Sequence, residues 1–325
     1  MAEEVLKATE GNVARREHLG LVDDSKASFR DFVDSPAKDG KAWWPTCSPK
    51  FRPKTRDRWR NILDKHLLPF FGGSLRGIRG ADAAHYISQR LKDGAAHETV
   101  RQELTVLGHI LRRAVEWELL GKNLLLDGQG RLLGDLRIKT TPGRIRFLSE
   151  AETAALLEAC KARPLLHESV LLALNTGCRR NELLSATRRT VDFERRTLTL
   201  QETKNGERRV VPLNETALGA LKAALKQSAK PLDKDAPLFP FKPLWLSVFF
   251  RRVAKRAGVE DFHLHDLRHC FATSHAQAGT AMRGLQALLG HRTAAMTQRY
   301  AHFADDALRA AVDAVQVGGA KTGND

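Results

Sequence analysis

The sequence predicts a mainly α-helical protein with a small antiparallel β-sheet, an α+β fold in two domains. The length of 325 residues suits about two domains. Apolar residues recur at helical spacing through most of the chain. Strand-like alternation is confined to the run RRTLTLQETKNGERRVVPL, which contains Asn205-Gly206. Asn-Gly between two alternating runs predicts a hairpin, because a type I′ turn needs positive φ at both central positions.

Composition and capping signals place the domain boundaries. Residues 134–146 combine Gly, Pro and charge with little apolar periodicity, which indicates a linker. Ser149 followed by Glu152 forms a capping box that begins a new helix directly after it. The predicted segments are a flexible N-terminus (1–24), a helical domain (25–133), a linker (134–146), a second domain (147–316) and a polar tail (317–325).

Helices are expected in both domains. In the first domain, the third helix is predicted to begin at Thr99, where Gln102 completes a second capping box. Glycines end several helices of the second domain. The predicted helices cover residues 55–68, 81–91, 99–120, 150–162, 169–178, 180–186, 215–226, 246–257, 266–278, 282–289 and 294–302, and an amphipathic run follows over 305–315.

The chain carries a large excess of positive charge. Its 53 Lys and Arg residues outnumber 38 Asp and Glu residues, for a net charge of +15 and a pI near 10.0. A chain this basic usually has a polyanionic partner, and nucleic acid is favoured over an anionic membrane surface. The simpler alternative is a basic surface that serves solubility alone.

Targeting signals and paired cysteines are not expected. No apolar run reaches the length of a membrane-spanning helix, and the first 20 residues lack the apolar segment of a signal peptide. The four cysteines are scattered and form no Cys-x-x-Cys pair. We therefore expect a cytoplasmic, reduced protein that has no membrane partner.

One helix start in the first domain is strongly basic. The segment SPKFRPKTRDRWRNILDK (48–65) holds seven basic and two acidic side chains, a net charge of +5. Lys and Arg placed in this way can pair with DNA phosphates and release condensed counterions, although a solvated helix face would look similar. The candidate DNA-binding residues are Lys50, Arg52, Lys54, Arg56, Arg58 and Arg60.

Four short segments of the second domain carry residues suited to phosphate chemistry. TGCRRNELL places Arg179 at the mouth of a helix, and TKNGERR places Lys204 beside the predicted hairpin turn. HLHDLRHCFATSH places His265 and Arg268 three residues apart, on one face of a helix. LGHRTAAMTQRYAH contains His291 after a glycine and Tyr300 nine residues later.

These four segments, in this order, resemble the catalytic domain of the tyrosine recombinases, the phage integrase family. The family pattern is an Arg in a TGxR segment, a Lys on a β-hairpin, HxxR, and LGH followed nine residues later by a nucleophilic Tyr. The six matching positions are Arg179, Lys204, His265, Arg268, His291 and Tyr300. The resemblance covers residues 147–304, whereas the first half resembles the family's helical core DNA-binding domain only in length, helicity and charge.

The resemblance implies a role for each of these residues. Arg179 and Arg268 stabilise the pentacoordinate phosphate, Lys204 protonates the departing 5′ oxygen, and His291 hydrogen-bonds the phosphate. His265 acts in proton transfer near Tyr300, which becomes joined to the 3′ phosphate. The phosphotyrosine conserves the bond energy, so no ATP, metal ion or other cofactor is needed. Glu182, three residues after Arg179, is expected to hold that Arg within its helix turn.

Each of these residues, taken alone, also fits a role that is structural rather than catalytic. The two arginines could be surface residues, Lys204 a plain hairpin lysine and Tyr300 a packing aromatic. Tyr86 is expected to pack in the first domain and Cys178 to be buried and unreactive. A zinc site could be drawn from His263, His265, His269 and Cys270, but no second Cys/His pair lies at finger spacing.

The resemblance implies a site-specific DNA recombinase or integrase. Its partner is a double-stranded DNA target site, and four protomers assemble on two such sites in a bacterial or phage-like, nucleoid-associated setting; the sequence identifies no accessory proteins. The run 305–315 is expected to dock on a neighbouring protomer. About 25 residues precede the helical domain, too few for the extra arm-binding domain of some integrases. The alternatives are relaxation of DNA strands like that of a type IB topoisomerase, or a non-catalytic DNA-binding regulator.

Overall fold

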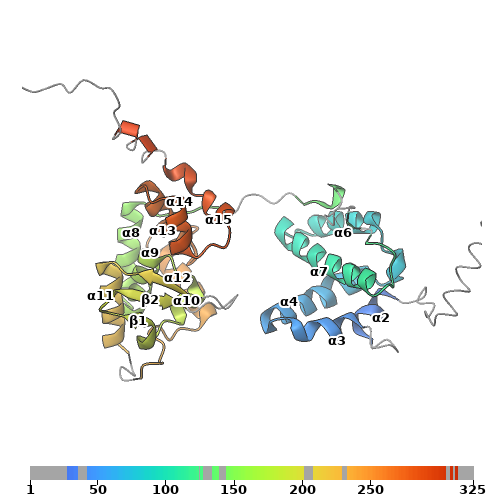
Figure 1. Ribbon diagram of the computed structural model, residues 1–325, viewed down its shortest axis with the longest axis horizontal. Coiled ribbons are helices and arrows are strands. Elements are labelled where there is room, and N and C mark those ends of the chain that lie inside the picture. Colours follow the sequence, from blue (N-terminus) through green and yellow to red (C-terminus); the bar gives the residue numbers. More distant parts are fainter. Residues whose placement is uncertain are drawn as a thin grey trace, which may run out of the picture. The chain divides into compact units, whose positions relative to one another are not determined.

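The computed structural model contains two compact units, residues 1–142 and 143–325 (Figure 1). It describes residues 28–35, 42–123, 125–126, 134–138, 144–200, 208–228, 233–304, 308–309 and 312–313. The predicted flexible N-terminus (1–24) and polar tail (317–325) lie outside these residues. No helix among the described residues is long and apolar enough to cross a membrane.

The first unit is built from helices where it is described. The predicted helix over 55–68 is longer than expected, because helical structure runs from Pro53 through Phe70 with a π-helical turn inside it. Pro69 follows this turn, and its missing N–H leaves a gap in the regular hydrogen-bond ladder. The elements are α2 (Phe29–Asp34), α3 (Trp43–Cys47), η2 (Ser48–Lys50), α4 (Pro53–Ile62), η3 (Leu63–Leu67), α5 (Leu68–Phe70), η4 (Leu75–Gly77), α6 (Gly80–Lys92), α7 (His97–Glu116) and η5 (Gly134–Leu136).

The predicted capping box at the start of the third long helix is wrong. Helix α7 begins at His97, and its N-cap Ala96 offers no side-chain hydrogen bond. Thr99 therefore lies inside the first turn, and the amide of Gln102 donates to Glu98 at 2.9 Å instead. Glu98 lies four residues before Gln102 on the same helix face, so it competes directly with the predicted partner.

A buried polar pair joins α6 to α7 within the core of the first unit. Tyr86, expected to pack here, is 1% exposed, and its hydroxyl donates to Glu103 at 2.7 Å. Glu103 is fully buried and also accepts from Arg90 Nη2 at 2.8 Å. The Arg90 guanidinium balances the charge of the buried Glu103 carboxylate. Removing either of these two side chains would therefore leave an uncompensated charge.

The second unit combines helices with one small sheet, as predicted for the fold class. Its sheet has the order β1-β2-β3 with both pairs antiparallel, and Leu198 lies opposite Val211. The two strands of the predicted hairpin are confirmed as β2 and β3, whereas Asn205 and Gly206 lie outside the described residues. The sequence did not predict β1. The strands are β1 (Val191–Asp192), β2 (Thr197–Leu200) and β3 (Arg209–Pro212).

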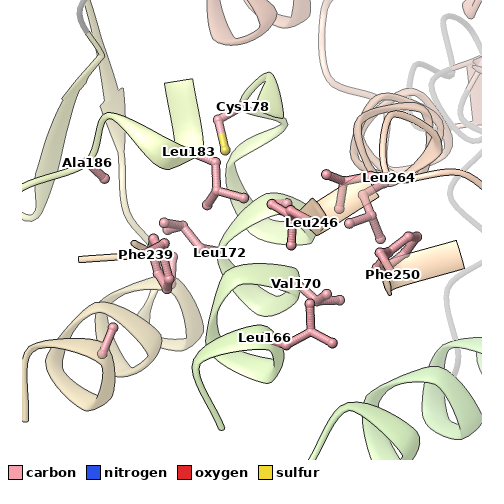
Figure 2. Close-up of a cluster of buried hydrophobic side chains, with 14 of the residues drawn as sticks. Leu166, Val170, Leu172, Cys178, Leu183, Ala186, Phe239, Leu246, Phe250 and Leu264 are labelled. Atoms are coloured by element: carbon pink, nitrogen blue, oxygen red, sulfur yellow. The ribbon is translucent and has the colours of Figure 1, made fainter. Parts of the chain in front are cut away.

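The core of the second unit is built around α9, which lies between several other helices (Figure 2). Leu166 and Val170 of α9 lie on the side of Phe250 of α12, whereas Leu172 points toward Phe239, and all five are at most 1% exposed. The helices are α8 (Glu150–Cys160), α9 (Pro164–Thr176), α10 (Arg180–Leu184), η6 (Arg188–Thr190), α11 (Glu215–Lys226), α12 (Pro243–Arg256), α13 (Asp266–Gln277), α14 (Met282–Leu289), α15 (Ala294–Gln298) and η7 (Ala301–Ala304).

Both ends of the predicted linker pack against their own unit. Leu136 is 1% exposed in the core of the first unit. Arg144 Nη2 donates to Asp266 at 2.8 Å, and Arg146 pairs with Glu152 in the second unit. The predicted capping box at the start of α8 is confirmed, with Glu152 N donating to Ser149 Oγ at 3.1 Å.

Candidate active site

The glycine that ends α9 sets the position of Arg179. Gly177 adopts a left-handed conformation (φ 59°), and an added Cβ would lie 2.5 Å from the ring of Phe271, so only glycine fits. Arg179 then becomes the N-cap of α10. Its backbone N–H and its Nη1 each donate to Glu182 at 2.8 Å, as expected for a supporting carboxylate.

Arg268 fastens α13 to the ends of two other helices. The side chain is almost fully buried, at 3% exposure. Its Nη1 donates to Gly177 O at 2.6 Å, and its Nη2 donates to Leu289 O at 2.5 Å. Burial, reinforced by the charges of Arg179 and Arg209, lowers the pKa of Arg268 to about 10. The positive charges of Arg179, Arg209 and Arg268 therefore lie close to one another.

His291 follows the left-handed residue that ends α14. Gly290 has φ 63°, and its carbonyl accepts from Arg179 Nη2 at 3.2 Å. The Nδ1 of His291 lies 2.9 Å from the buried hydroxyl of Thr297. Burial and the neighbouring charge of Arg268 lower the pKa of His291 to about 4, so the ring is neutral at pH 7.

Tyr300 occupies a turn rather than the predicted helix over 294–302. Helix α15 ends at Gln298, and Tyr300 N donates to Thr297 O in a tighter turn before η7 begins. The ring is 2% exposed and packs in a cluster on α13 and α14 that includes Leu285 and Leu289. Burying the ring there turns the chain, which ends the helix early.

His269, not His265, contacts the tyrosine hydroxyl. Its Nδ1 lies 2.6 Å from Tyr300 Oη, and both groups are buried. His265 is exposed, and its ring centre lies 5.4 Å from that of His269. From the sequence alone, His269 is considered only as a possible zinc ligand. The four-residue spacing, which places both rings on one helix face, is the signal that could have found it.

The two histidines and the tyrosine all favour their neutral forms. Burial first, and then His265, lower the pKa of His269 to about 4. Loss of hydration against the surrounding protein atoms, followed by the charge of Arg268, lowers the pKa of His265, although part of this residue reaches solvent. Burial raises the pKa of Tyr300, although Arg299 and Arg268 oppose that rise. Tyr300 and His269 therefore share a hydrogen bond between two neutral groups.

Lys204 lies outside the described residues, but the strands on either side of it reach the site. Leu200 of β2 is paired with Arg209 of β3. Arg209 Nη2 donates to Glu182 at 2.8 Å, and its Nη1 donates to Leu288 O. Glu182 therefore bridges two arginines. Sequence reasoning missed Arg209, whose only signal was its place in the hairpin that carries Lys204.

A cavity of about 330 Å³ opens beside these residues. Five arginines and one histidine contribute to its wall, and none of the described residues that line it is acidic. Such a cavity suits an anion. The lining residues are Arg179, Arg208, Arg209, Arg283, Gln286, Ala287, Gly290, His291 and Arg292.

The basic helix start of the first unit is mostly exposed, with one exception. Lys50, Lys54, Arg56 and Arg58 are exposed. Arg60 instead donates to Asp64 at 2.9 Å and to Asp34 at 3.2 Å. Its charge is already balanced within the fold, and Asp34 lies on a different helix that local sequence reasoning could not place beside it.

Metal-binding geometry is not found among the described residues. No group of three or more His, Cys, Asp or Glu side chains is arranged there to hold a metal ion. His263 instead lies near Arg144, and His269 near Tyr300. Cys178 is 5% exposed, and burial raises the pKa of its thiol to about 11, which keeps it unreactive at pH 7.

Known proteins match this chain in both sequence and fold. Residues 146–307 match the sequence profile of the Phage integrase family. Tyrosine recombinase XerD of Pseudomonas aeruginosa is 30% identical over 267 residues, which span 77% of this chain and 87% of that protein. The integrase of Salmonella phage P22 is 29% identical over 228 residues, 66% of this chain but only 56% of its own length. The Tn1549 transposon integrase, solved in complex with a circular intermediate DNA, superposes with a TM-score of 0.68 at 22% identity, over 84% of this chain and 98% of that chain.

Proposed function

We propose a function from one premise: this chain belongs to the phage integrase family. It is a site-specific DNA recombinase that cuts and rejoins DNA strands through a 3′-phosphotyrosyl intermediate. It needs neither a metal ion nor ATP, because the covalent intermediate conserves the energy of the phosphodiester bond. Its substrate is double-stranded DNA that carries a target site, in the cytoplasm and in association with the nucleoid.

One observation supports this proposal most strongly. The guanidinium groups of Arg179 and Arg268 bind the carbonyl oxygens of two consecutive residues, Gly290 and Leu289. The next residue is His291, which lines the same cationic cavity as Arg179. Segments far apart in the sequence thus present two arginines and a histidine within one site. A single phosphate is the ligand that such a site suits best.

The proposed reaction follows from these positions. The Tyr300 hydroxyl oxygen attacks phosphorus, and the bond from phosphorus to the 5′ oxygen breaks. Arg179 and Arg268 stabilise the charge of the pentacoordinate state, and His291 hydrogen-bonds a phosphate oxygen. Lys204 gives its proton to the departing 5′ oxygen. A second DNA strand then attacks through its 5′ hydroxyl and releases the tyrosine.

Tyr300 must move before it reacts. Its hydroxyl is buried and hydrogen-bonded to His269, whose lowered pKa makes it a poor base. His265 is exposed nearby, so it is available for proton transfer once the tyrosine reaches the phosphate. We assign the observed arrangement to a resting state.

Movement of Tyr300 provides a way to couple cleavage to assembly. We propose that four protomers assemble on two DNA sites and that residues 305–315 dock on a neighbouring protomer. Of that run the structure describes four residues, among which Leu308 is 61% exposed and Val312 is 73% exposed. Their spacing of four residues places these apolar side chains on one helix face.

A trapped covalent intermediate tests the activity. Duplexes tiled across the DNA that neighbours the gene, each nicked just beyond a potential cleavage position, release the short fragment and prevent religation. The full chain is expected to form a denaturant-resistant protein–DNA adduct with one of them, and Tyr300→Phe is not. Tyr86→Phe is the matched control, because it removes the only other tyrosine.

Three outcomes would contradict the proposal. Equal adduct from the wild-type chain and Tyr300→Phe would remove Tyr300 from the reaction. Relaxation of a supercoiled plasmid that lacks every recovered site would indicate a topoisomerase. Tight DNA binding without any adduct across the tiled set would indicate a regulator.

A further inference from the structure

The cationic cavity extends beyond the residues that the proposed reaction uses. Arg179 and His291 form part of its wall, and Arg208, Arg283 and Arg292 form another part. We propose that Arg283 and Arg292, assisted by Arg208, bind the DNA phosphate next to the one that is cleaved. The inference rests on the proposed function and assigns a second phosphate subsite to the same cavity.

The three additional arginines come from segments whose positions are fixed by the site itself. Arg283 lies in the first turn of α14, the helix whose last residues accept from Arg268 and Arg209. Arg292 directly follows His291. Arg208 precedes Arg209, which is tied to Glu182 and Leu288. Each is therefore anchored through a neighbour that belongs to the scissile-phosphate site.

Among the described residues, two arginines of this cavity lack the carboxylate partner that arginines elsewhere in the unit have. Arg189 pairs with Asp235, and Arg146 pairs with Glu152. In the part of the chain that the structure describes, neither Arg208 nor Arg283 has a carboxylate partner. Glu182 is shared by Arg179 and Arg209 and contributes nothing to the rest of the wall. An anion in the cavity would relieve the repulsion among these like charges.

The number of guanidinium groups exceeds what one phosphate needs. A phosphodiester offers two free oxygens, and the proposed reaction already directs Arg179 and Arg268 at them. Arg209 donates to Glu182 and to a backbone carbonyl, and the proposed reaction assigns it no phosphate oxygen. Arg208, Arg283 and Arg292 are exposed in the same concave surface. A DNA strand supplies a second phosphate immediately beside the first, about 3.4 Å further along the helix axis.

The role inferred for Arg283 and Arg292 is positioning. They hold the strand so that the scissile phosphate lies against Arg179, without contacting the reacting atoms. Removing either side chain should weaken binding of the substrate and leave the rate of cleavage at saturating DNA nearly unchanged. A residue needed only for folding would change neither quantity selectively.

Replacing single phosphates with neutral methylphosphonates tests the subsite. The nicked duplex recovered as an adduct is prepared as a series, each member neutral at one linkage beside the scissile phosphate. For the wild-type chain, one such linkage should weaken binding on the order of tenfold, the scale of one charge-assisted hydrogen bond. For Arg283→Ala or Arg292→Ala, the same linkage should weaken binding clearly less than in the wild-type chain, since one of the guanidinium groups that would bind it is already absent. Arg195→Ala is the control, an arginine 86% exposed at the β1–β2 turn.

The inference and the proposed function fail in different ways. If the wild-type chain forms no adduct with any duplex, the proposed function fails. If it forms the adduct but each neutral linkage weakens Arg283→Ala and Arg292→Ala as much as wild type, the second subsite is contradicted. A fall in the saturating cleavage rate without weaker binding would also contradict a positioning role.

Discussion

At the scale of single residues, the buried carboxylate of Glu182 fixes the positions of two arginines of the site. It is 2% exposed and accepts from both Arg179 and Arg209. Burial raises its pKa, but the charge of Arg209 and the hydrogen bonds from the arginines outweigh burial and lower it overall. Glu182 therefore stays ionised and fixes two guanidinium groups that would otherwise repel each other.

Glu182→Gln should damage both stability and activity. Removing one partner of a buried ion pair costs about 3–5 kcal/mol, because the remaining charges are no longer compensated. Hydrogen exchange of peptides from α10 and α13 measures this destabilisation locally, and adduct formation should fall with it. The control is Glu215→Gln, which removes a 73% exposed carboxylate paired with Arg196. Equal protection in both variants would contradict the role of Glu182.

The histidine beside Tyr300 predicts a pH dependence of stability. In the folded chain the pKa of His269 is about 4, below its ordinary value of 6.5. Between these values the unfolded chain binds more protons, so stability is fully present above pH 6.5 and is lost as pH falls towards 4. At pH 5 the decrease relative to pH 7 is about 2 kcal/mol for this residue, which is 8% exposed.

His269→Gln should remove that part of the pH dependence. Denaturant unfolding of the second unit, measured by hydrogen exchange at pH 7 and pH 5, gives the two stabilities. The difference between them should shrink in His269→Gln, since glutamine does not titrate. An unchanged difference would show that the proton is taken up elsewhere.

At the scale of elements, the left-handed residue that ends α14 places His291. An added Cβ at Gly290 would lie 2.7 Å from Arg209 Cδ, and its φ of 63° is strained for any side chain. Gly258 also has positive φ (75°), but nothing lies within 4 Å of its added Cβ. Comparing alanine substitutions at the two glycines therefore distinguishes the effect of backbone strain from the effect of a collision with Arg209.

Gly290→Ala should cost more than Gly258→Ala. The shared left-handed strain is roughly 1–2 kcal/mol in each variant. Gly290→Ala also displaces Arg209, so adduct formation should fall sharply, whereas Gly258→Ala should retain it. Thermal unfolding and adduct yield, measured for both, test this. Equal adduct yields would show that the approach of Arg209 to Gly290 is unimportant.

Elements with strong local signals could be predicted, and those set by distant contacts could not. The Ser149 capping box and the antiparallel strands around residues 201–207 follow from neighbouring residues, and the structure has both. The start of α7 was misplaced because Glu98 competes for Gln102. The end of α15 was misplaced because Tyr300 is buried against α13 and α14, which no local pattern reveals.

The same distinction applies to the site. A family pattern identified six positions, but spacing alone could not show which histidine meets the tyrosine. His265 and His269 share a helix face, and only the fold places His269 at the hydroxyl. Arg60 was grouped with the DNA-binding candidates, yet Asp34 of another helix neutralises it.

At the scale of the whole molecule, the net charge of +15 predicts a binding affinity for DNA that falls with salt. The first unit contributes through the exposed side chains near the start of α4, Lys54, Arg56 and Arg58. Arg60 on the same helix is held by Asp34 and Asp64, so its charge is not available to a phosphate. One helix therefore offers both test residues and a control.

Removing the three exposed charges should reduce the salt dependence of DNA binding. The slope of log affinity against log salt should become less steep by about 1 for each Lys or Arg that no longer pairs with a phosphate, hence by about 3 in the triple variant Lys54→Ala, Arg56→Ala, Arg58→Ala. Arg60→Ala should leave the slope unchanged and lower the stability of the first unit. Fluorescence anisotropy of a labelled duplex over a salt series measures the slope. A larger change in slope for Arg60→Ala than for the triple variant would reverse the assignment.

The attachment point of the DNA tests the account most directly. Trypsin cleavage after Arg299 and Arg309 yields the peptide YAHFADDALR, which begins with Tyr300 and contains no other tyrosine. Mass spectrometry of the digested adduct should find a nucleotide remnant on that peptide, joined through a 3′ phosphate to the tyrosine. A remnant on any other residue, or a 5′-phosphate linkage at Tyr300, would contradict the proposed reaction.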